Sequence, residues 1–169
     1  MSNIMEKFNL QNKTAVVTGG AGLLGKQFCN TLAEAGAKVV VADLDEVAAQ
    51  GIADDIKNRG YQAIGSQVDI TNPESVKKMV GDTVAMYDRL DILVCSAAMD
   101  PKFDPEHQGA HGNSFEDYPL ESWNNALDVN LTGMFLSTQA AVKPMMAQNY
   151  GDNSDLFNVW AGWPGSTYI

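Results

Sequence analysis

The sequence predicts an α/β protein with a doubly wound parallel sheet, in which helices cover both faces to give three layers. Short apolar runs alternate with longer helical segments, and such runs are typical of parallel strands that are buried on both sides. Glycine, asparagine and aspartate occupy the junctions, where they end helices and strands. Repeated strand–helix units with right-handed crossovers give this class of sheet.

The first unit consists of a strand, a glycine-rich turn, a helix and a second strand, over residues 14–17, 18–25, 26–35 and 39–42. Gly36 ends the helix, and Asp43 ends the second strand eighteen residues after Gly25. Glycines let the backbone approach a pyrophosphate, and the helix start offers unpaired N–H groups. An acid at the second strand tip accepts hydrogen bonds from a ribose, so the unit predicts dinucleotide binding. The alternative is a tight turn whose glycines serve packing alone.

Further helices and strands are expected over residues 46–59 (helix), 61–68 (strand), 73–87 (helix), 91–94 (strand), 120–130 and 131–148 (helices). Asn72 and Pro73 predict a helix start, because asparagine caps helices and proline suits the first helical position. A break in the last helical stretch is expected near Gly133. Residues 99–118 form a long loop, which we interpret as lying on the substrate side.

Composition and charge exclude several kinds of partner. The net charge of −10 and a pI of about 4.4 argue against nucleic acid and against anionic membrane surfaces. The first ten residues hold no apolar run, so we expect neither a signal peptide nor a membrane span. Cys29 and Cys95 lack CxxC spacing and are expected to be reduced thiols in a cytoplasmic protein.

One histidine pair has a spacing that is found at metal sites. His107 and His111 are four residues apart, with Glu106 beside them, and this spacing binds metal when it falls on a helix. Prolines and glycines surround the pair and favour a loop instead. The sequence therefore predicts no metal site.

Residues 10–151 resemble the short-chain dehydrogenase/reductase family, beginning with the glycine turn. The turn has the spacing TGxxGxxG, which is closer to the extended branch of the family than to the usual TGxxxGxG. Leu23 stands where the usual branch has glycine. Asp69 matches the strand-tip acid that contacts adenine in the family.

Two later segments extend this resemblance. Residues 91–98 resemble the family segment D-[IV]-L-V-N-N-A-G, but Cys95 and Ser96 replace both asparagines and Ala98 replaces the glycine. Residues 123–133 resemble the helix that carries the active-site asparagine, which maps to Asn130.

The resemblance implies an NAD-binding, Rossmann-like domain over residues 1–151, with a sheet that is incomplete at its C-terminal side. The implied cofactor contacts are Gly19, Gly22, Leu23, Leu24, Gly25, Asp43, Leu44, Asp69, Ile70, Ser96, Ala97 and Ala98, and the implied catalytic residue is Asn130. NAD is favoured over NADP because Leu44-Asp45-Glu46 follows Asp43 and the turn holds no lysine or arginine. A ribose phosphate would meet carboxylates there.

The family chemistry is hydride transfer assisted by a tyrosine, whose pKa a lysine lowers within Y-x-x-x-K. A serine orients the substrate and an asparagine holds a relay water. Asn130 is present, but no tyrosine of this chain is followed by lysine at that spacing. We therefore expect the chain to be catalytically incomplete, and an intact parent to oxidise or reduce a small alcohol or ketone, sugar-like by loose resemblance.

Residues 152–169 show no family resemblance. Reading their codons one nucleotide later converts Trp160 and Trp163 to glycine and permits a segment I-S-S-T-Y-G, which resembles the catalytic serine segment of the family. We hypothesise a single-base slip near codon 152, with a native tail as the alternative. Residues 156–160 are apolar enough to pair with the strand over residues 91–94.

Other interpretations stay open at this point. A non-catalytic dinucleotide-binding module, a gene product without a function of its own, and an extended-branch enzyme acting on nucleotide-sugars are the alternatives. The helix over residues 131–148 is apolar on several sides, and in the family such a helix packs in a subunit interface. We expect a homo-oligomer for the intact parent, with an ordinary buried helix as the alternative.

Overall fold

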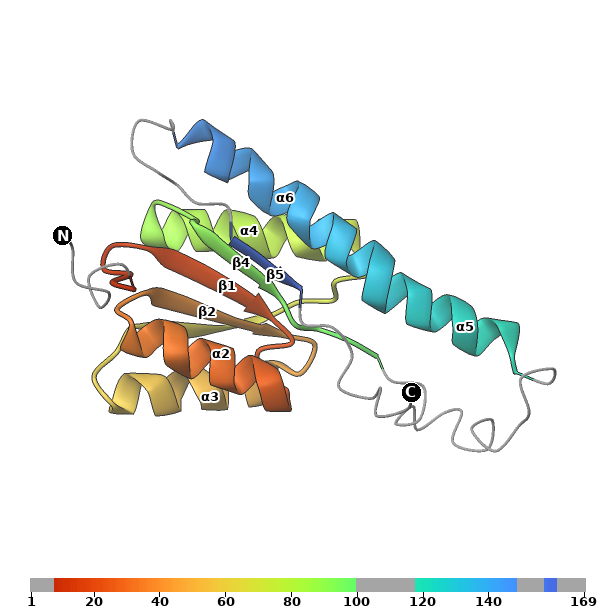
Figure 1. Ribbon diagram of the computed structural model, residues 1–169, viewed down its shortest axis with the longest axis horizontal. Coiled ribbons are helices and arrows are strands. Elements are labelled where there is room, and N and C mark those ends of the chain that lie inside the picture. The colour runs from red at the N-terminus through yellow and green to blue at the C-terminus, as the bar shows by residue number, and fades with distance from the viewer. Residues whose placement is uncertain (1–7, 100–117, 149–156, 161–169) are drawn as a thin grey trace.

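A computed structural model describes residues 8–99, 118–148 and 157–160. Parallel strands form one sheet in the order β3-β2-β1-β4-β5, and helices cover both faces (Figure 1). The strands are β1 (Thr14–Thr18), β2 (Lys38–Asp43), β3 (Ala63–Gln67), β4 (Ile92–Cys95) and β5 (Phe157–Trp160). The helices are α2 (Leu23–Glu34), α3 (Glu46–Asn58), α4 (Pro73–Tyr87), α5 (Leu120–Leu127) and α6 (Met134–Ala147). The predicted fold class is confirmed.

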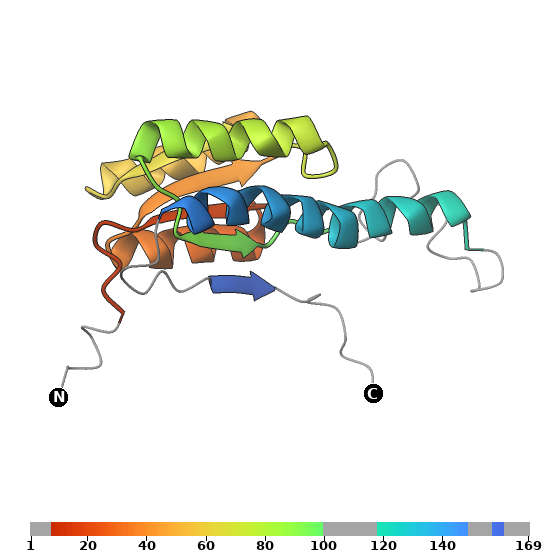
Figure 2. The same cartoon turned by 90° about the horizontal axis from the view of Figure 1, so that it is seen from above.

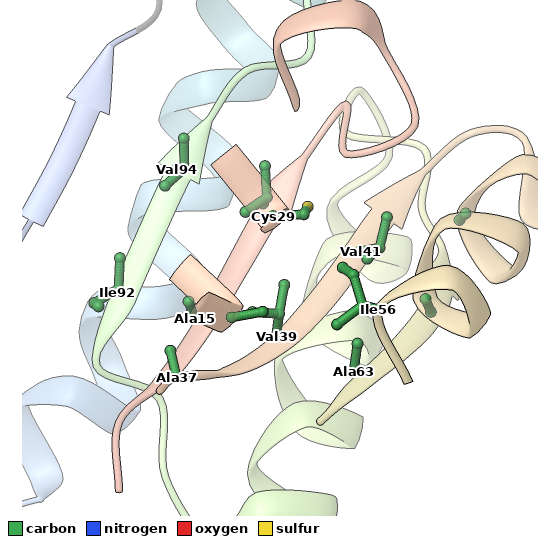
Figure 3. Close-up of a cluster of buried hydrophobic side chains, with 13 residues drawn as sticks. Ala15, Cys29, Ala37, Val39, Val41, Ile56, Ala63, Ile92 and Val94 are labelled. Atoms are coloured by element: carbon green, nitrogen blue, oxygen red, sulfur yellow. The ribbon is translucent and has the colours of Figure 1, made fainter. Parts of the chain in front are cut away.

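The central strands separate two apolar cores because their side chains alternate between the faces of the sheet. On one face, residues of β1, β2 and β4 pack against α2 and α3, including Val39, Val41 and Ile56 (Figure 3). On the other face, Val16 and Val40 pack with residues of α4 and α6. All five residues of β1 are buried, which explains why its sequence is a continuous short run without alternation.

Several element boundaries differ from the predicted ones. Helix α2 begins at Leu23, three residues before the predicted start, because the last glycine of the turn is already helical. Strand β3 is shorter than predicted, since it lies at the edge of the sheet and pairs only with β2. Strand β4 runs from Ile92 to Cys95, one residue later than predicted.

Local signals at helix ends are confirmed. The Asn72 side chain accepts hydrogen bonds from the N–H groups of Glu74 and Ser75, and Pro73 is the first residue of α4. Gly36 and Gly60 follow α2 and α3 with φ of +101° and +89°, a region that glycine enters without steric cost.

The predicted break near Gly133 is a change of helical pitch. A π-helical segment, η4 (Asp128–Gly133), joins α5 to α6 without interruption. The resulting rod projects past the carboxyl ends of the strands (Figures 1 and 2). At the other end of the rod, the side-chain amide of Gln148 donates to the carbonyl of Leu90 at 2.9 Å. The Gln148 side-chain oxygen accepts from the N–H of Leu90 at 2.7 Å. These bonds fasten α6 to the segment that leads into β4.

The predicted pairing of the tail with β4 is also found. Strand β5 is parallel to β4, with Ile92 opposite Phe157 and Cys95 opposite Trp160. The rest of the tail and most of the predicted loop over residues 99–118 lie outside the described residues. Within the described ranges, no helix has the length and apolarity needed to cross a membrane.

Candidate functional site

A cleft of about 510 Å³ lies at the carboxyl end of the sheet, where an open α/β sheet binds its ligands. Nine of the predicted cofactor residues line it: Gly19, Gly22, Asp43, Leu44, Asp69, Ile70, Ser96, Ala97 and Ala98. Seven lining residues were not predicted: Ala21, Asp45, Ala48, Val68, Thr71, Met99 and Val129. Most of these lie one or two residues from a predicted one. The positions of the strand ends therefore indicate that the neighbouring residues also line the cleft.

The glycine turn forms one wall of the cleft through close backbone contacts. Gly19 has φ of +66°, and a Cβ atom there would lie 2.6 Å from the backbone of Ala97. A Cβ atom on Gly25 would lie 2.0 Å from the carbonyl oxygen of Gly19. Gly22, the N-cap of α2, has no side chain, so the cap residue itself leaves the first N–H groups of the helix without a side-chain acceptor. The turn thus presents bare backbone and a helix N-terminus to the cleft, as binding of a pyrophosphate requires.

Three predicted contacts do not line the cleft. Leu23 and Leu24 occupy the first turn of α2, where Leu23 is 87% exposed. Gly25 is buried beneath Gly19, so its lack of a side chain serves the packing of helix against turn. Their assignment as cofactor contacts stays a prediction.

Asp43 places a carboxylate beside the turn. One of its oxygens accepts from the N–H of Ala21 at 3.0 Å and the other from the N–H of Asp45 at 3.2 Å. Asp45 in turn caps α3 by accepting from the N–H of Ala48. Each carboxylate oxygen has a further lone pair. Asp43 is therefore held in place and still able to accept from ribose hydroxyls.

Asn130 lies beside the cleft and contacts its wall. Its side-chain oxygen accepts from the N–H of Met99 at 2.8 Å, and its amide nitrogen donates to the carbonyl of Met99 at 2.9 Å. Residues 128–133 are π-helical, and π-turns are frequent at functional sites. The observed role of the Asn130 side chain is to fix the chain that follows β4.

Neither cysteine is poised for chemistry. Burial raises the pKa of the Cys29 thiol to about 12 and also raises the pKa of Cys95, whose sulfur lies 4.0 Å from the Thr138 hydroxyl. Both thiols are therefore protonated at neutral pH. The described residues contain no cluster of three acidic, histidine or cysteine side chains suited to a metal, and His107 and His111 lie outside them.

Comparison with known proteins identifies the family to which the fold belongs. Residues 13–152 match the short chain dehydrogenase family. A dehydrogenase subunit of Thauera aromatica, acting on (2S)-[(R)-hydroxy(phenyl)methyl]succinyl-CoA, is 35% identical over 94% of this chain and 60% of its own length. An NAD-dependent glycerol dehydrogenase of Listeria innocua is 34% identical over 85% of this chain and 52% of its own.

Solved structures agree with this result. A short-chain type dehydrogenase/reductase from Mycobacterium marinum superimposes with a TM-score of 0.80 at 31% identity, covering 93% of this chain and 59% of that one. The chain thus spans a little more than half the length of the relatives it matches. On the family match, the sheet order and the glycine turn, the chain belongs to the short-chain dehydrogenase family.

Proposed function

We propose that the cleft binds NAD, and that the whole protein is an NAD-dependent oxidoreductase acting on a small alcohol or ketone. One observation carries the choice of cofactor. Three carboxylates, those of Asp43, Asp45 and Asp69, line the cleft, and none of its described lining residues is lysine or arginine. The additional phosphate of NADP would meet negative charge without a basic partner.

The residues present fit such a cofactor. The turn around Gly19 and Gly22 would hold the pyrophosphate, Asp43 the adenosine ribose, and Asp69 the adenine. When bound, NAD supplies the hydride acceptor. The part of this chain is to bind and orient the dinucleotide, while Asn130 keeps the chain after β4 in place through Met99.

The alcohol or ketone substrate class rests on two relatives and on the chemistry of the family. The Listeria innocua relative is a glycerol dehydrogenase, and a Sphingobium indicum relative, 32% identical over 84% of this chain, is a cyclohexadiene-diol dehydrogenase. Both names denote oxidation of a hydroxyl-bearing carbon. A polyhydroxylated, sugar-like substrate agrees with both.

We propose further that these 169 residues bind the cofactor without completing hydride transfer. They contain no tyrosine followed by lysine in the Y-x-x-x-K pattern. A tyrosine near its ordinary pKa is a weak acid–base catalyst at neutral pH. A dinucleotide-binding module without turnover is therefore the activity we expect of this chain.

Calorimetric titration with NAD and with NADP tests the proposal. We expect NAD to bind at least tenfold more tightly, and Asp43→Ala to weaken NAD more than the matched change Asp55→Ala on the exposed face of α3. No alcohol-dependent reduction of NAD should be detected. Absence of NAD binding, or equal affinity for NADP, would contradict the assignment.

The exposed face of the α5–η4–α6 rod supports self-association, which we also propose. Large apolar side chains recur there every three or four residues, at Leu120, Trp123, Leu127, Leu131 and Phe135. Sedimentation velocity should show an oligomer that Phe135→Glu dissociates. Val47→Glu, at an even more exposed apolar residue on α3, should leave the oligomer intact. A monomeric wild-type chain would refute this interface.

We propose that residues 152–169 arise from a shift of the reading frame. The match to the family model ends at residue 152, where the hypothesis places the slip, although the alignment with the Thauera aromatica relative covers 94% of the chain and extends past this residue. Sequencing the coding DNA tests it directly. A shifted frame that continues into Tyr-x-x-x-Lys supports the slip, and codons that give no serine segment in that frame remove it.

Two buried free cysteines agree with a reducing compartment, and we propose a cytoplasmic location on that ground. Fractionation of the native cells tests this location. Recovery of the protein in a fraction from an oxidising compartment would overturn it.

A further inference from the structure

The segment between β3 and α4 holds the Asp69 carboxylate in one orientation. Its Oδ1 atom accepts two hydrogen bonds from Thr71, one from the backbone N–H at 2.9 Å and one from the hydroxyl at 2.6 Å. The N–H of Asp69 donates to the hydroxyl of Ser75 in the first turn of α4. The same turn is capped by Asn72. The backbone of Asp69 is therefore hydrogen-bonded to the first turn of α4 and does not belong to a free loop.

The second carboxylate oxygen of Asp69, Oδ2, has no hydrogen-bond donor among the described residues. Asp69 is exposed, and both Asp69 and Thr71 line the cleft. Two donors on Oδ1 oppose rotation of the carboxylate about its last bond. Hydrogen bonds to an ionised acceptor are among the strong ones, so this restraint persists in water.

We propose that Thr71 is a positioning residue for recognition of the adenine base. By holding Oδ1, Thr71 leaves Oδ2 in a fixed place as the acceptor for the exocyclic amino group of adenine. This inference rests on the proposed function, namely that the cleft binds NAD. It also implies discrimination at one atom, because hypoxanthine carries an oxygen where adenine carries the amino group. Oδ2 of Asp69 and the hypoxanthine oxygen are both acceptors and would face each other, which disfavours binding of hypoxanthine.

The test compares NAD with nicotinamide hypoxanthine dinucleotide, which differs from NAD at that position. Calorimetry on the 169-residue chain should show at least a tenfold preference for NAD. In Thr71→Val the hydroxyl is lost while the backbone N–H remains, so we expect NAD affinity to fall roughly five- to tenfold, which lies within the range of one typical hydrogen bond at an exposed site. The affinity for the hypoxanthine analogue should hardly change, so the ratio of the two affinities should fall.

Two further variants separate positioning from general damage. Thr71→Ser keeps the hydroxyl and should restore most of the preference. Thr31→Val, at an exposed threonine on α2, should not change it. An unchanged preference in Thr71→Val, or equal weakening of both ligands, would overturn the role of Thr71. A wild-type chain that binds neither dinucleotide would instead refute the proposed function itself, and the inference with it.

Discussion

Asp91 is a buried carboxylate whose hydrogen-bond partners lie at the start of β1 and just before β4. The side chain is 3% exposed and lies at the amino edge of the sheet, opposite the cleft. It accepts from the N–H of Thr14 at 2.9 Å and from Nε of Arg89 at 2.7 Å, and Nζ of Lys13 lies 3.5 Å away. The carboxylate thus links the starts of β1 and β4. Asp91→Asn removes its charge and keeps its shape.

The size of the effect follows from these partners. A hydrogen bond to a charged group contributes about 1.5–3 kcal/mol, and breaking a buried ion pair costs about 3–5 kcal/mol. Arg89 is 38% exposed and regains water when its partner is lost, which reduces the cost. The asparagine oxygen can still accept from Thr14. We therefore expect the free energy of unfolding to fall by about 2–3 kcal/mol at pH 7.

The effect should also depend on pH, with a definite sign. Burial alone would raise the pKa of Asp91, but the hydrogen bonds from Arg89 and Thr14 and the charges of Arg89 and Lys13 together hold it below the ordinary 3.8. A carboxyl with a depressed folded pKa contributes stability above its unfolded pKa and loses it as the pH falls through the folded value. The difference between wild type and Asp91→Asn should therefore shrink below pH 4.

Urea unfolding at several pH values between 7 and 2.5 measures this difference. Asp82→Asn is the matched control, since Asp82 pairs with Lys78 on the exposed surface of α4 and should contribute less than about 1 kcal/mol. Equal stability of wild type and Asp91→Asn at pH 7 would refute the reasoning. A difference that stays constant down to pH 2.5 would refute the electrostatic part of it.

Three further changes test packing and capping, each by urea unfolding. Gly51→Ala should stabilise the chain by about 0.5–1 kcal/mol, since a methyl group there meets open space within α3; a loss of stability would contradict this. Gly133→Ala should destabilise by about 1–3 kcal/mol because the new Cβ would lie 2.6 Å from Cδ1 of Ile70. Because truncation of Ile70 removes this clash, Ile70→Ala should cost less stability in the Gly133→Ala background than in the wild type. Asn72→Ala should cost about 1 kcal/mol through the lost cap of α4, and no cost would speak against the cap.

The parts of the fold that could be predicted are those fixed by local sequence. The apolar runs that became β1, β2 and β4, the cap at Asn72 and the glycines after α2 and α3 all act within a few residues. The carboxyl ends of parallel strands meet at one edge, and this rule alone brought Gly19, Asp43, Asp69 and Ser96 together.

The remainder depends on contacts between distant segments. The sequence around Gly133 predicts a break, but the structure has a π-helical segment there. In this segment Gly133 lies close to Ile70, and Asn130 pairs with Met99. Asn130 and Met99 are thirty-one residues apart, and no local pattern announces such a pair. The predicted start of α2 is three residues late for a related reason, since Gly25 packs against Gly19 from within the helix and the motif alone does not indicate this contact.

The cofactor contacts that we propose all lie within the described residues, whereas the tyrosine–lysine pattern of the family is absent from these 169 residues. Every described lining residue of the cleft except Val129 comes before residue 100, at or after the carboxyl ends of the first four strands. The acids that would receive the cofactor are fixed by nearby backbone N–H groups and by Thr71. A cofactor site of this kind does not require the tyrosine and lysine that perform proton transfer in the family. Affinity for NAD without turnover is therefore the combination that these residues favour, and a titration and an activity assay on one sample decide it.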